Sequence, residues 1–373
     1  MRLHDIGDRL AKLPDMVAGL VHAGEPRLRA LEVPADNPGK LAAFTYVPAD
    51  TSAPMPLVVV LHGCTQDAAG YDAGSGWSDL AEAHGFALLF PQQARANNPN
   101  LCFNWFQPAD TQRGRGEAAS IAAMIGGMCD AHPIDRQRIF VTGLSAGGAM
   151  ASVMLASYPE IFAAGAIIAG IPYGVASGVG EALECMSGRG ARFDAAALGD
   201  KVRTAAPRPA RWPRISVWHG TADPTVAASN GDAIAAQWTN VLGLGEPDVT
   251  DDVDGFPRRA WTGAGGTVLV EQYAITGMGH GTPLKPGRGD GHSGTARAHM
   301  LDVGISSTDR ITEFFGIVGK AGHPARSETV RSRTAAAAER NVPASSGTTR
   351  QASPASGPQK VIEDALRAAG LMR

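Results

Sequence analysis

The 373-residue sequence lacks the features that mark several protein classes. Its net charge is only −3, so nothing in its charge predicts binding to nucleic acid or to an anionic membrane surface. No apolar run approaches the roughly 20 residues that a membrane-spanning helix needs. The first 20 residues interrupt their apolar positions with charges and contain no signal-peptide core. As written, the sequence therefore predicts a cytoplasmic protein.

Cysteine is scarce, and its spacing argues against a metal site. The four cysteines, at positions 64, 102, 129 and 185, include no C-x-x-C pair, so we expect no bound zinc or other metal. Free buried thiols are the default state in a reducing compartment. In an oxidising one, Cys64 and Cys102 are the pair to test for a disulfide, because both lie beside candidate active-site segments.

The pattern of apolar residues predicts a doubly wound α/β domain with a mostly parallel sheet. Hydrophobic residues make up 44% of the chain and charged residues 18%, enough for a sizeable core. Continuous β-branched and apolar runs, typical of strands buried on both faces, alternate with helical patterns. We expect strands at 41–47, 57–62, 86–90, 138–142, 163–169, 215–219 and 267–275, and helices at 77–84, 116–131, 146–158 and about 230–241.

Composition divides the chain into four parts. We expect residues 1–36 to be an N-terminal extension with a short helix near 6–20, and residues 37–318 to be the main α/β domain, with an irregular insertion at 171–213. Residues 319–359 are rich in Ala, Ser, Pro and Arg and predict a disordered linker. Residues 360–373 predict a short amphipathic helix that either contacts a partner or packs back on the domain. The oligomeric state stays open.

The segment Gly143-Leu144-Ser145-Ala146-Gly147 has the G-x-S-x-G form. It follows a predicted strand and precedes a predicted helix, which is the context of a nucleophile elbow. A sharp turn there exposes the serine hydroxyl at the carboxyl edge of the sheet, where ligands bind in this architecture. A serine hydroxyl is a weak nucleophile by itself and needs a base and an orienting acid.

Both partners follow in the order that this architecture expects, Ser, Asp and then His. Asp223 lies in HGTADPTV, directly after the predicted strand at 215–219. His280 lies in a glycine-flanked loop after the last predicted strand. Each loop begins at the carboxyl end of its strand. We therefore predict Ser145, Asp223 and His280 as a catalytic triad.

Four other residues compete for the roles of base and acid. His292 lies in another glycine-rich loop but farther from any predicted strand. His62 and His219 each end a strand and precede glycine, a position more typical of packing within a turn. Asp232 falls within a predicted helix.

An ester hydrolase also needs two N–H groups to hold the oxyanion of the tetrahedral intermediate. The amide of Ala146, next to the nucleophile, is the first candidate, and the amide of Cys64, in the loop after the strand at 57–62, is the second. The aromatic residues Trp105 and Phe106 lie in a Pro- and Asn-rich loop. They either line the substrate site or pack into the core.

These motifs together resemble the polyhydroxybutyrate (PHB) depolymerase family of esterases, which belongs to the α/β-hydrolase superfamily. That family is similar to feruloyl and acetylxylan esterases. The resemblance covers about residues 38–318. It is carried by the segments LHGCTQDAAGYDAGSGWSDLAEAHGFALLFPQQ, CFNWFQPADTQRGRGEAASI, GLSAGGAM and SVWHGTADPTV.

The resemblance implies the same triad. It also implies that the His62-Gly63-Cys64 turn forms part of the oxyanion hole and contacts the substrate. It implies no cofactor. The expected activity is a serine carboxylester hydrolase that cleaves 3-hydroxybutyrate-type polyester or oligomer bonds through an acyl-enzyme. Feruloyl or acetylxylan ester hydrolysis, and acyl transfer by the same triad, are the alternatives. Secreted family members usually carry a signal peptide, and polymer-degrading members a polymer-binding domain. The resemblance therefore also leaves an extracellular location open.

Overall fold

The computed structural model describes residues 27–318, apart from residue 34 and residues 50–52, 190–193 and 288. The helix expected at 6–20, the linker at 319–359 and the helix at 360–373 lie outside the described residues. Among the residues that are described, no helix is long and apolar enough to cross a membrane.

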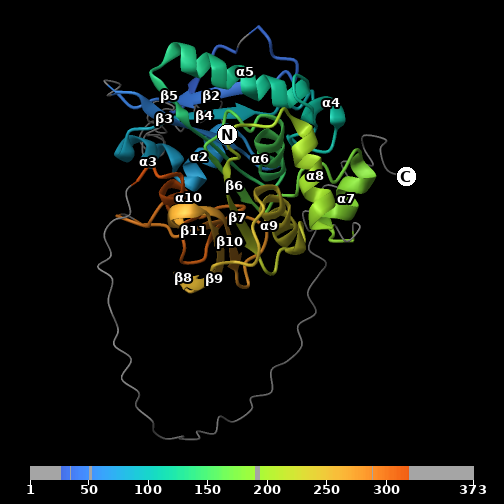
Figure 1. Ribbon diagram of the computed structural model, residues 1–373. Helices are drawn as coiled ribbons and strands as arrows, with labels where there is room; N and C mark the ends of the chain where they lie inside the picture. Colours follow the sequence, from blue (N-terminus) through green and yellow to red (C-terminus); the bar gives the residue numbers. More distant parts are fainter. Residues whose placement is uncertain (1–26, 34, 50–52, 190–193, 288, 319–373) are drawn as a thin grey trace, which may run out of the picture.

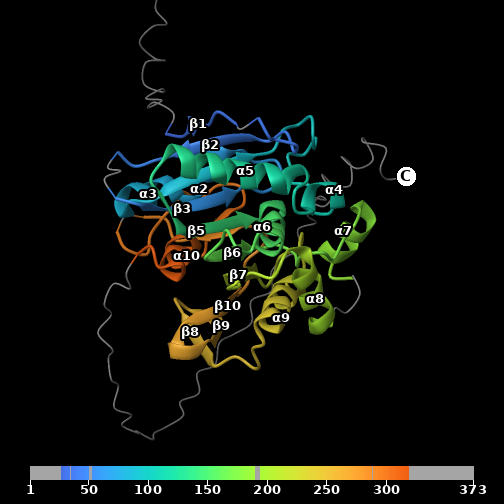
Figure 2. The ribbon, with the colours of Figure 1, turned by 45° about the horizontal axis from the view of Figure 1, so that its top comes forward.

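A ten-stranded sheet forms the centre of the protein. In Figure 2 it runs from β1 at the top to β8 at the bottom. In spatial order its strands are β1 (Arg29–Ala30), β2 (Ala42–Tyr46), β4 (Ala87–Gln92), β3 (Met55–Leu61), β5 (Ile134–Leu144), β6 (Ala164–Ile168), β7 (Arg214–Gly220), β10 (Val268–Ile275), β9 (Phe256–Thr262) and β8 (Val249–Val253).

The six central strands, from β4 to β10, are parallel, and the strands at both edges are antiparallel. The carboxyl ends of the central strands therefore share one rim of the sheet, which is where the loops that carry Ser145, Asp223 and His280 begin. The predicted fold class, a doubly wound and mostly parallel α/β sheet, is confirmed.

Helices cover both faces of the sheet, so the core has two layers (Figure 1). Strand β3 is buried along its whole length. Its side chains alternate between the layers, with Leu57, Val59 and Leu61 on one side and Val58 and Val60 on the other. The first layer contains side chains of α5 (Gly116–Ala131), α6 (Ala146–Ser157), α8 (Ala195–Ala205) and α9 (Ser229–Leu242), and the second those of α2 (Ala68–Ser75), α3 (Trp77–His84) and α10 (Ser307–Phe315).

Three of the predicted helices end at or just before a glycine or a proline. Helix α3 stops at Gly85, whose N–H donates to the Ala81 carbonyl and whose left-handed φ of 68° turns the chain away from the helix. Helix α5 ends before Pro133 and helix α6 before Pro159, because proline offers no N–H to continue the ladder.

The prediction that the insertion at 171–213 is irregular is wrong. The insertion contains two helices, α7 (Val179–Met186) and α8. Helix α7 buries only Ala182 and Cys185, so its apolar pattern is too short to stand out in the sequence. The sheet also begins before the expected domain boundary at residue 37, because β1 pairs with β2.

Several further elements, α2 among them, were not predicted from the sequence. The hairpin of β8 and β9 turns at Asp254-Gly255, both with positive φ, and Asp-Gly is a strong hairpin signal. Helix α10 begins after Ser306, whose side chain accepts the N–H of Asp309. Short strands β11 (Thr282–Leu284) and β12 (Met300–Asp302) form a separate parallel pair after the His280 loop, and α4 (Pro108–Thr111) is a single turn.

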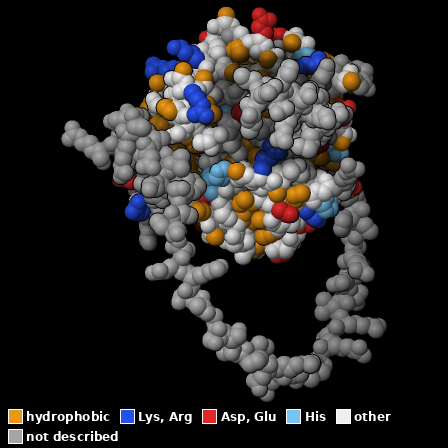
Figure 3. All heavy atoms as spheres, turned by 180° about the vertical axis from the view of Figure 1, so that it is seen from behind, with side chains coloured by type: hydrophobic (Ala, Val, Ile, Leu, Met, Phe, Trp, Pro, Cys, Tyr) orange, Lys and Arg blue, Asp and Glu red, His pale blue; other side chains and the backbone are white. Residues whose placement is uncertain are grey.

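The described surface carries mixed charge. In Figure 3, acidic and basic side chains are interspersed among apolar and uncharged ones on the face shown. This distribution agrees with the net charge of −3.

Candidate active site

Ser145 occupies the turn between β5 and α6, as the G-x-S-x-G motif predicts. Its backbone has φ 57° and ψ −118°, a conformation that non-glycine residues rarely adopt and that is typical of functional turns. The Ser145 N–H donates to the Ile168 carbonyl of β6 at 2.9 Å. The turn is therefore fixed to the neighbouring strand at the carboxyl rim of the sheet.

The two glycines of the motif allow a backbone contact that no larger residue could make. A Cβ atom on Gly147 would lie 2.2 Å from the carbonyl oxygen of Leu61, and one on Gly143 would lie 2.4 Å from that of Gly147. The start of α6 can therefore pack directly against the end of β3. The first N–H groups of a helix have no intrahelical partner, and they carry the positive end of its dipole.

Asp223 and His280 form a buried pair, in which His280 lines the pocket and Asp223 does not. The Asp223 side chain is fully buried and that of His280 is 8% exposed, and His280 Nδ1 lies 2.7 Å from Asp223 Oδ2. The other carboxylate oxygen accepts the N–H groups of Thr225 and Val226 at 2.8 and 2.9 Å.

The protonation states of this pair follow from its contacts. Burial alone raises the pKa of Asp223, but the hydrogen bond and charge of His280, with the two backbone N–H groups, outweigh it, so the pKa lies below its ordinary value. An ionised carboxylate only accepts hydrogen bonds, so His280 Nδ1 must carry the proton. His280 Nε2 is then free to accept one.

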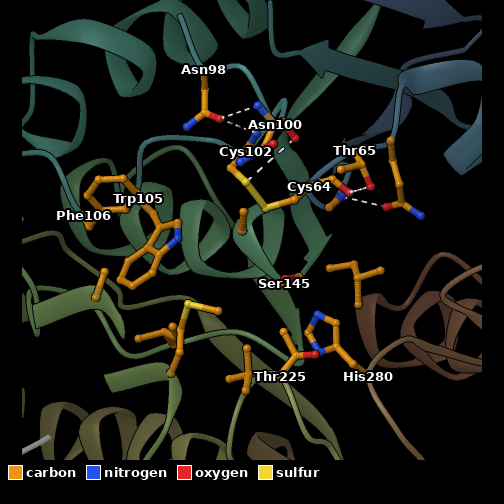
Figure 4. A pocket seen from close by; sticks show the side chains of 18 of the residues that line it. Cys64, Thr65, Asn98, Asn100, Cys102, Trp105, Phe106, Ser145, Thr225 and His280 are labelled. Atoms are coloured by element: carbon orange, nitrogen blue, oxygen red, sulfur yellow. Dashed lines mark hydrogen bonds between the residues drawn. A yellow bond between two sulfur atoms is a disulfide. The ribbon is translucent and has the colours of Figure 1, made fainter. Parts of the chain in front are cut away.

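Ser145 and His280 line the same pocket, which has a volume of about 300 Å³ (Figure 4). One wall is apolar: Trp105 and Phe106, with rings in edge contact at 5.4 Å, stand on one side, as the close-up shows. The insertion supplies more of this wall, from Ile171 and from Val179, Ala182, Leu183 and Met186 of α7. Such a pocket suits a short apolar group beside the serine.

The two predicted oxyanion residues, Cys64 and Ala146, also line the pocket, as does Gly63. Cys64 forms a disulfide with Cys102, so the default of free thiols is wrong for this pair. The Thr65 N–H donates to the Asn100 carbonyl at 2.7 Å. A disulfide and a backbone hydrogen bond therefore link the loop after β3 to the loop after β4.

His62, which the resemblance implies at the substrate, does not line the pocket. Its side chain is buried against Phe103, with ring centroids 5.0 Å apart. Nδ1 donates to the Gly63 carbonyl, and Nε2 accepts the N–H of Gln93. Burial lowers the pKa of His62, which keeps the ring neutral in this arrangement.

The other rivals lie outside the described pocket lining. His219 is buried, with Nε2 2.9 Å from the Val226 carbonyl and 3.6 Å from Asp223. Asp232 is paired with Arg259. His292 Nδ1 contacts the carbonyl of Asp290 in its own loop.

His299 is a polar pocket residue that was not predicted from the sequence. It precedes β12, has a positive φ of 59° and lines the pocket. Its Nδ1 lies 3.2 Å from the His280 carbonyl, and the two rings meet edge to face at 5.9 Å. No motif surrounds it, and the pairing of β12 with β11, after the His280 loop, brings it to the site.

Known proteins with similar sequences identify relatives of this chain. Residues 41–252 match the family described as Esterase PHB depolymerase. Poly(3-hydroxyalkanoate) depolymerase C of Paucimonas lemoignei is 50% identical over 289 residues, which cover 76% of this chain and 68% of that protein. Feruloyl esterase B of Thermothelomyces thermophilus is 31% identical over 274 residues, covering 71% and 88%.

A solved structure has the same architecture. The acetyl xylan esterase from Aspergillus awamori superposes with a TM-score of 0.66 at 24% identity, over 78% of this chain and 99% of that one. At 24% identity, this similarity shows a shared fold and nothing more.

Proposed function

The chain belongs to the PHB depolymerase family of esterases, and from that premise we propose that Ser145, His280 and Asp223 form its catalytic triad. It is a serine carboxylester hydrolase with the α/β-hydrolase fold. The observation that carries the triad is the 2.7 Å contact of Asp223 with His280, together with the place of His280 and Ser145 on one pocket.

The proposed reaction is a two-step acyl transfer. Ser145 Oγ attacks the ester carbonyl while His280 Nε2 takes its proton and then passes it to the departing alcohol. Asp223 holds the imidazole in the tautomer with Nδ1 protonated and stabilises the imidazolium. Water then repeats the sequence on the acyl-enzyme, which releases the acid and the free serine.

The oxyanion of each tetrahedral intermediate would lie between two amides. The Ala146 N–H is at the start of α6, where it has no helical partner. The Cys64 N–H has no hydrogen-bond partner among the described residues. The disulfide of Cys64 and the Thr65 contact support this role, because they fix the loop that carries the amide.

For the substrate we propose short-chain hydroxyalkanoate esters of the 3-hydroxybutyrate type, as oligomer or polymer. The relative named as a poly(3-hydroxyalkanoate) depolymerase shares 50% identity, against 31% for the feruloyl esterase. The small apolar wall of Trp105, Phe106 and α7 suits a short acyl group. Because disulfides persist in oxidising surroundings, the Cys64–Cys102 bond supports an extracellular place of action.

The test compares rates on 3-hydroxybutyrate oligomers, methyl ferulate, acetylated xylan and short p-nitrophenyl esters. We expect kcat/KM to be highest among the natural esters for the hydroxybutyrate oligomers, and Ser145→Ala to abolish turnover of all of them. A higher kcat/KM for methyl ferulate or acetylated xylan would show that the proposed substrate is wrong. Adding an alcohol tests the acyltransferase alternative, which requires ester product at the expense of acid.

A further inference from the structure

Glu117 is a buried acid that the proposed mechanism does not use. It is the second residue of α5, is 1% exposed and does not line the pocket. Both carboxyl oxygens accept hydrogen bonds: Oε1 from Gln93 Nε2 at 2.5 Å and Oε2 from the Asn104 N–H at 2.8 Å. The donors come from the residue directly after β4 and from the loop before α4, so Glu117 joins two segments.

These segments lead to the proposed oxyanion hole. Gln93 Nε2 also donates to the Cys102 carbonyl at 3.0 Å, and the Gln93 N–H donates to His62 Nε2 at 3.2 Å. Cys102 is bonded to Cys64, which follows His62 by two residues. A closed ring of contacts thus runs from Glu117 to both ends of the turn that presents the Cys64 amide.

We propose that Glu117 is a positioning residue of the oxyanion hole: it fixes residues 102–104 and, through Gln93 and the disulfide, the Cys64 N–H. This inference rests on the proposed function, in which that N–H binds the oxyanion. Glu117 touches no substrate and acts only through its neighbours.

The chemistry of the contact explains why a carboxyl group is needed. Two N–H donors converge on the end of one side chain, and a carboxylate can accept both. A glutamine there has a single acceptor, so its NH₂ group would oppose one of the donors. Leaving a buried donor without a partner is unfavourable, and the loop would shift to relieve it.

The ionisation of Glu117 gives a readout that a purely structural role would not. Burial, opposed by the two hydrogen bonds, raises its pKa to about 8. Two other titratable groups face this network, Asp110, whose Oδ1 accepts the Glu117 N–H, and the buried His62 beyond Gln93. Above that pH the carboxylate accepts both hydrogen bonds at full strength, so kcat should rise as the pH passes about 8.

The matched control is Glu271→Gln. Glu271 is also a buried acid, 3% exposed, whose pKa burial raises. It contacts Ser216 and Arg258 on β7 and β9, and it does not line the pocket. A comparison with Glu117→Gln therefore separates a general effect of removing a buried carboxyl from an effect on the oxyanion hole.

Above pH 8, where the wild-type carboxyl is ionised, we expect Glu117→Gln to lower kcat by about 10- to 100-fold, because small displacements of an oxyanion donor have effects of this size. KM for a short p-nitrophenyl ester should change less than about twofold. Affinity for an alkyl trifluoromethyl ketone, which adds to the serine and forms an oxyanion, should fall in parallel with kcat. The step in kcat near pH 8 should disappear, and Glu271→Gln should keep wild-type kcat, ketone affinity and pH profile.

Glu117→Asp, which keeps the carboxylate but shortens the side chain, serves if the glutamine variant does not fold. It should lower kcat and ketone affinity together, and retain a pH step. The inference is overturned if wild-type protein is active and the folded Glu117 variants match Glu271→Gln in kcat and ketone affinity. Wild-type protein that hydrolyses no ester would instead refute the proposed function.

Discussion

Removing the Cys64–Cys102 disulfide should affect both stability and rate. The bond closes a loop with a sequence separation of 38 residues. The chain-entropy relation for a loop of that length gives about 4 kcal/mol of stabilisation, through the constraint on the unfolded chain. For a domain of this size, that loss corresponds to a fall in Tm on the order of 10 °C.

The same change should slow catalysis. Without the disulfide, the loop that carries the Cys64 amide keeps its backbone contact between Thr65 and Asn100 but loses its covalent tie to residue 102. We expect kcat to fall by about tenfold, less than the 10²- to 10³-fold loss that follows removal of an oxyanion donor.

The assay pairs thermal unfolding with steady-state kinetics for Cys64→Ala/Cys102→Ala and for protein treated with a phosphine reductant. A thiol count confirms reduction, since the oxidised protein has two free cysteines, Cys129 and Cys185. Cys129→Ala is the control, because this half-buried thiol has no disulfide. If fully reduced protein unfolds at the wild-type temperature and keeps wild-type kcat, the reasoning about this loop is wrong.

Three other outcomes follow from the structure. Asp223→Asn should lower kcat by about 10⁴-fold, as in the serine protease precedent, since His280 would lose the acceptor that fixes its tautomer; rates at saturating ester check this. Gly147→Ala should destabilise the fold by more than about 3 kcal/mol, because its Cβ would meet the Leu61 carbonyl at 2.2 Å; urea unfolding measures the change. The pKa of Glu117 in the folded protein, about 8, exceeds the ordinary value of 4.5 for a glutamic acid. Between these pH values the folded state binds a proton that the unfolded chain has lost, so this group's contribution to stability falls as pH rises from about 4.5 to 8. Urea unfolding at pH 5 and pH 9 should show a smaller decline for Glu117→Gln, and an unchanged decline would contradict the argument.

The central part of the fold was predictable because its signals are local. Strand β3 is a continuous apolar run that is buried throughout, and α3 ends at a glycine. The order of strands and helices then placed three loops at one rim of the sheet. That is why Ser145 and His280 could be expected on one pocket before any distance was known.

The features that could not be predicted from the sequence depend on contacts between distant segments. Glu117 looks like an ordinary residue at the start of a helix, and its role emerges only when Gln93 and Asn104 converge on it. His299 follows no strand signal and reaches the pocket through pairing of two three-residue strands. Helix α7 forms much of the apolar wall but is only eight residues long, too short for the spacing of its apolar residues to predict a helix.

The central claim is that Ser145 is the nucleophile, and covalent labelling tests it most directly. An alkyl phosphonate carrying a fluoride leaving group should inactivate the enzyme with one adduct per chain. Peptide mapping by mass spectrometry should place that adduct on Ser145, and Ser145→Ala should take up none. Complete inactivation with the adduct on another residue, or ester hydrolysis at the wild-type rate by Ser145→Ala, would contradict the account.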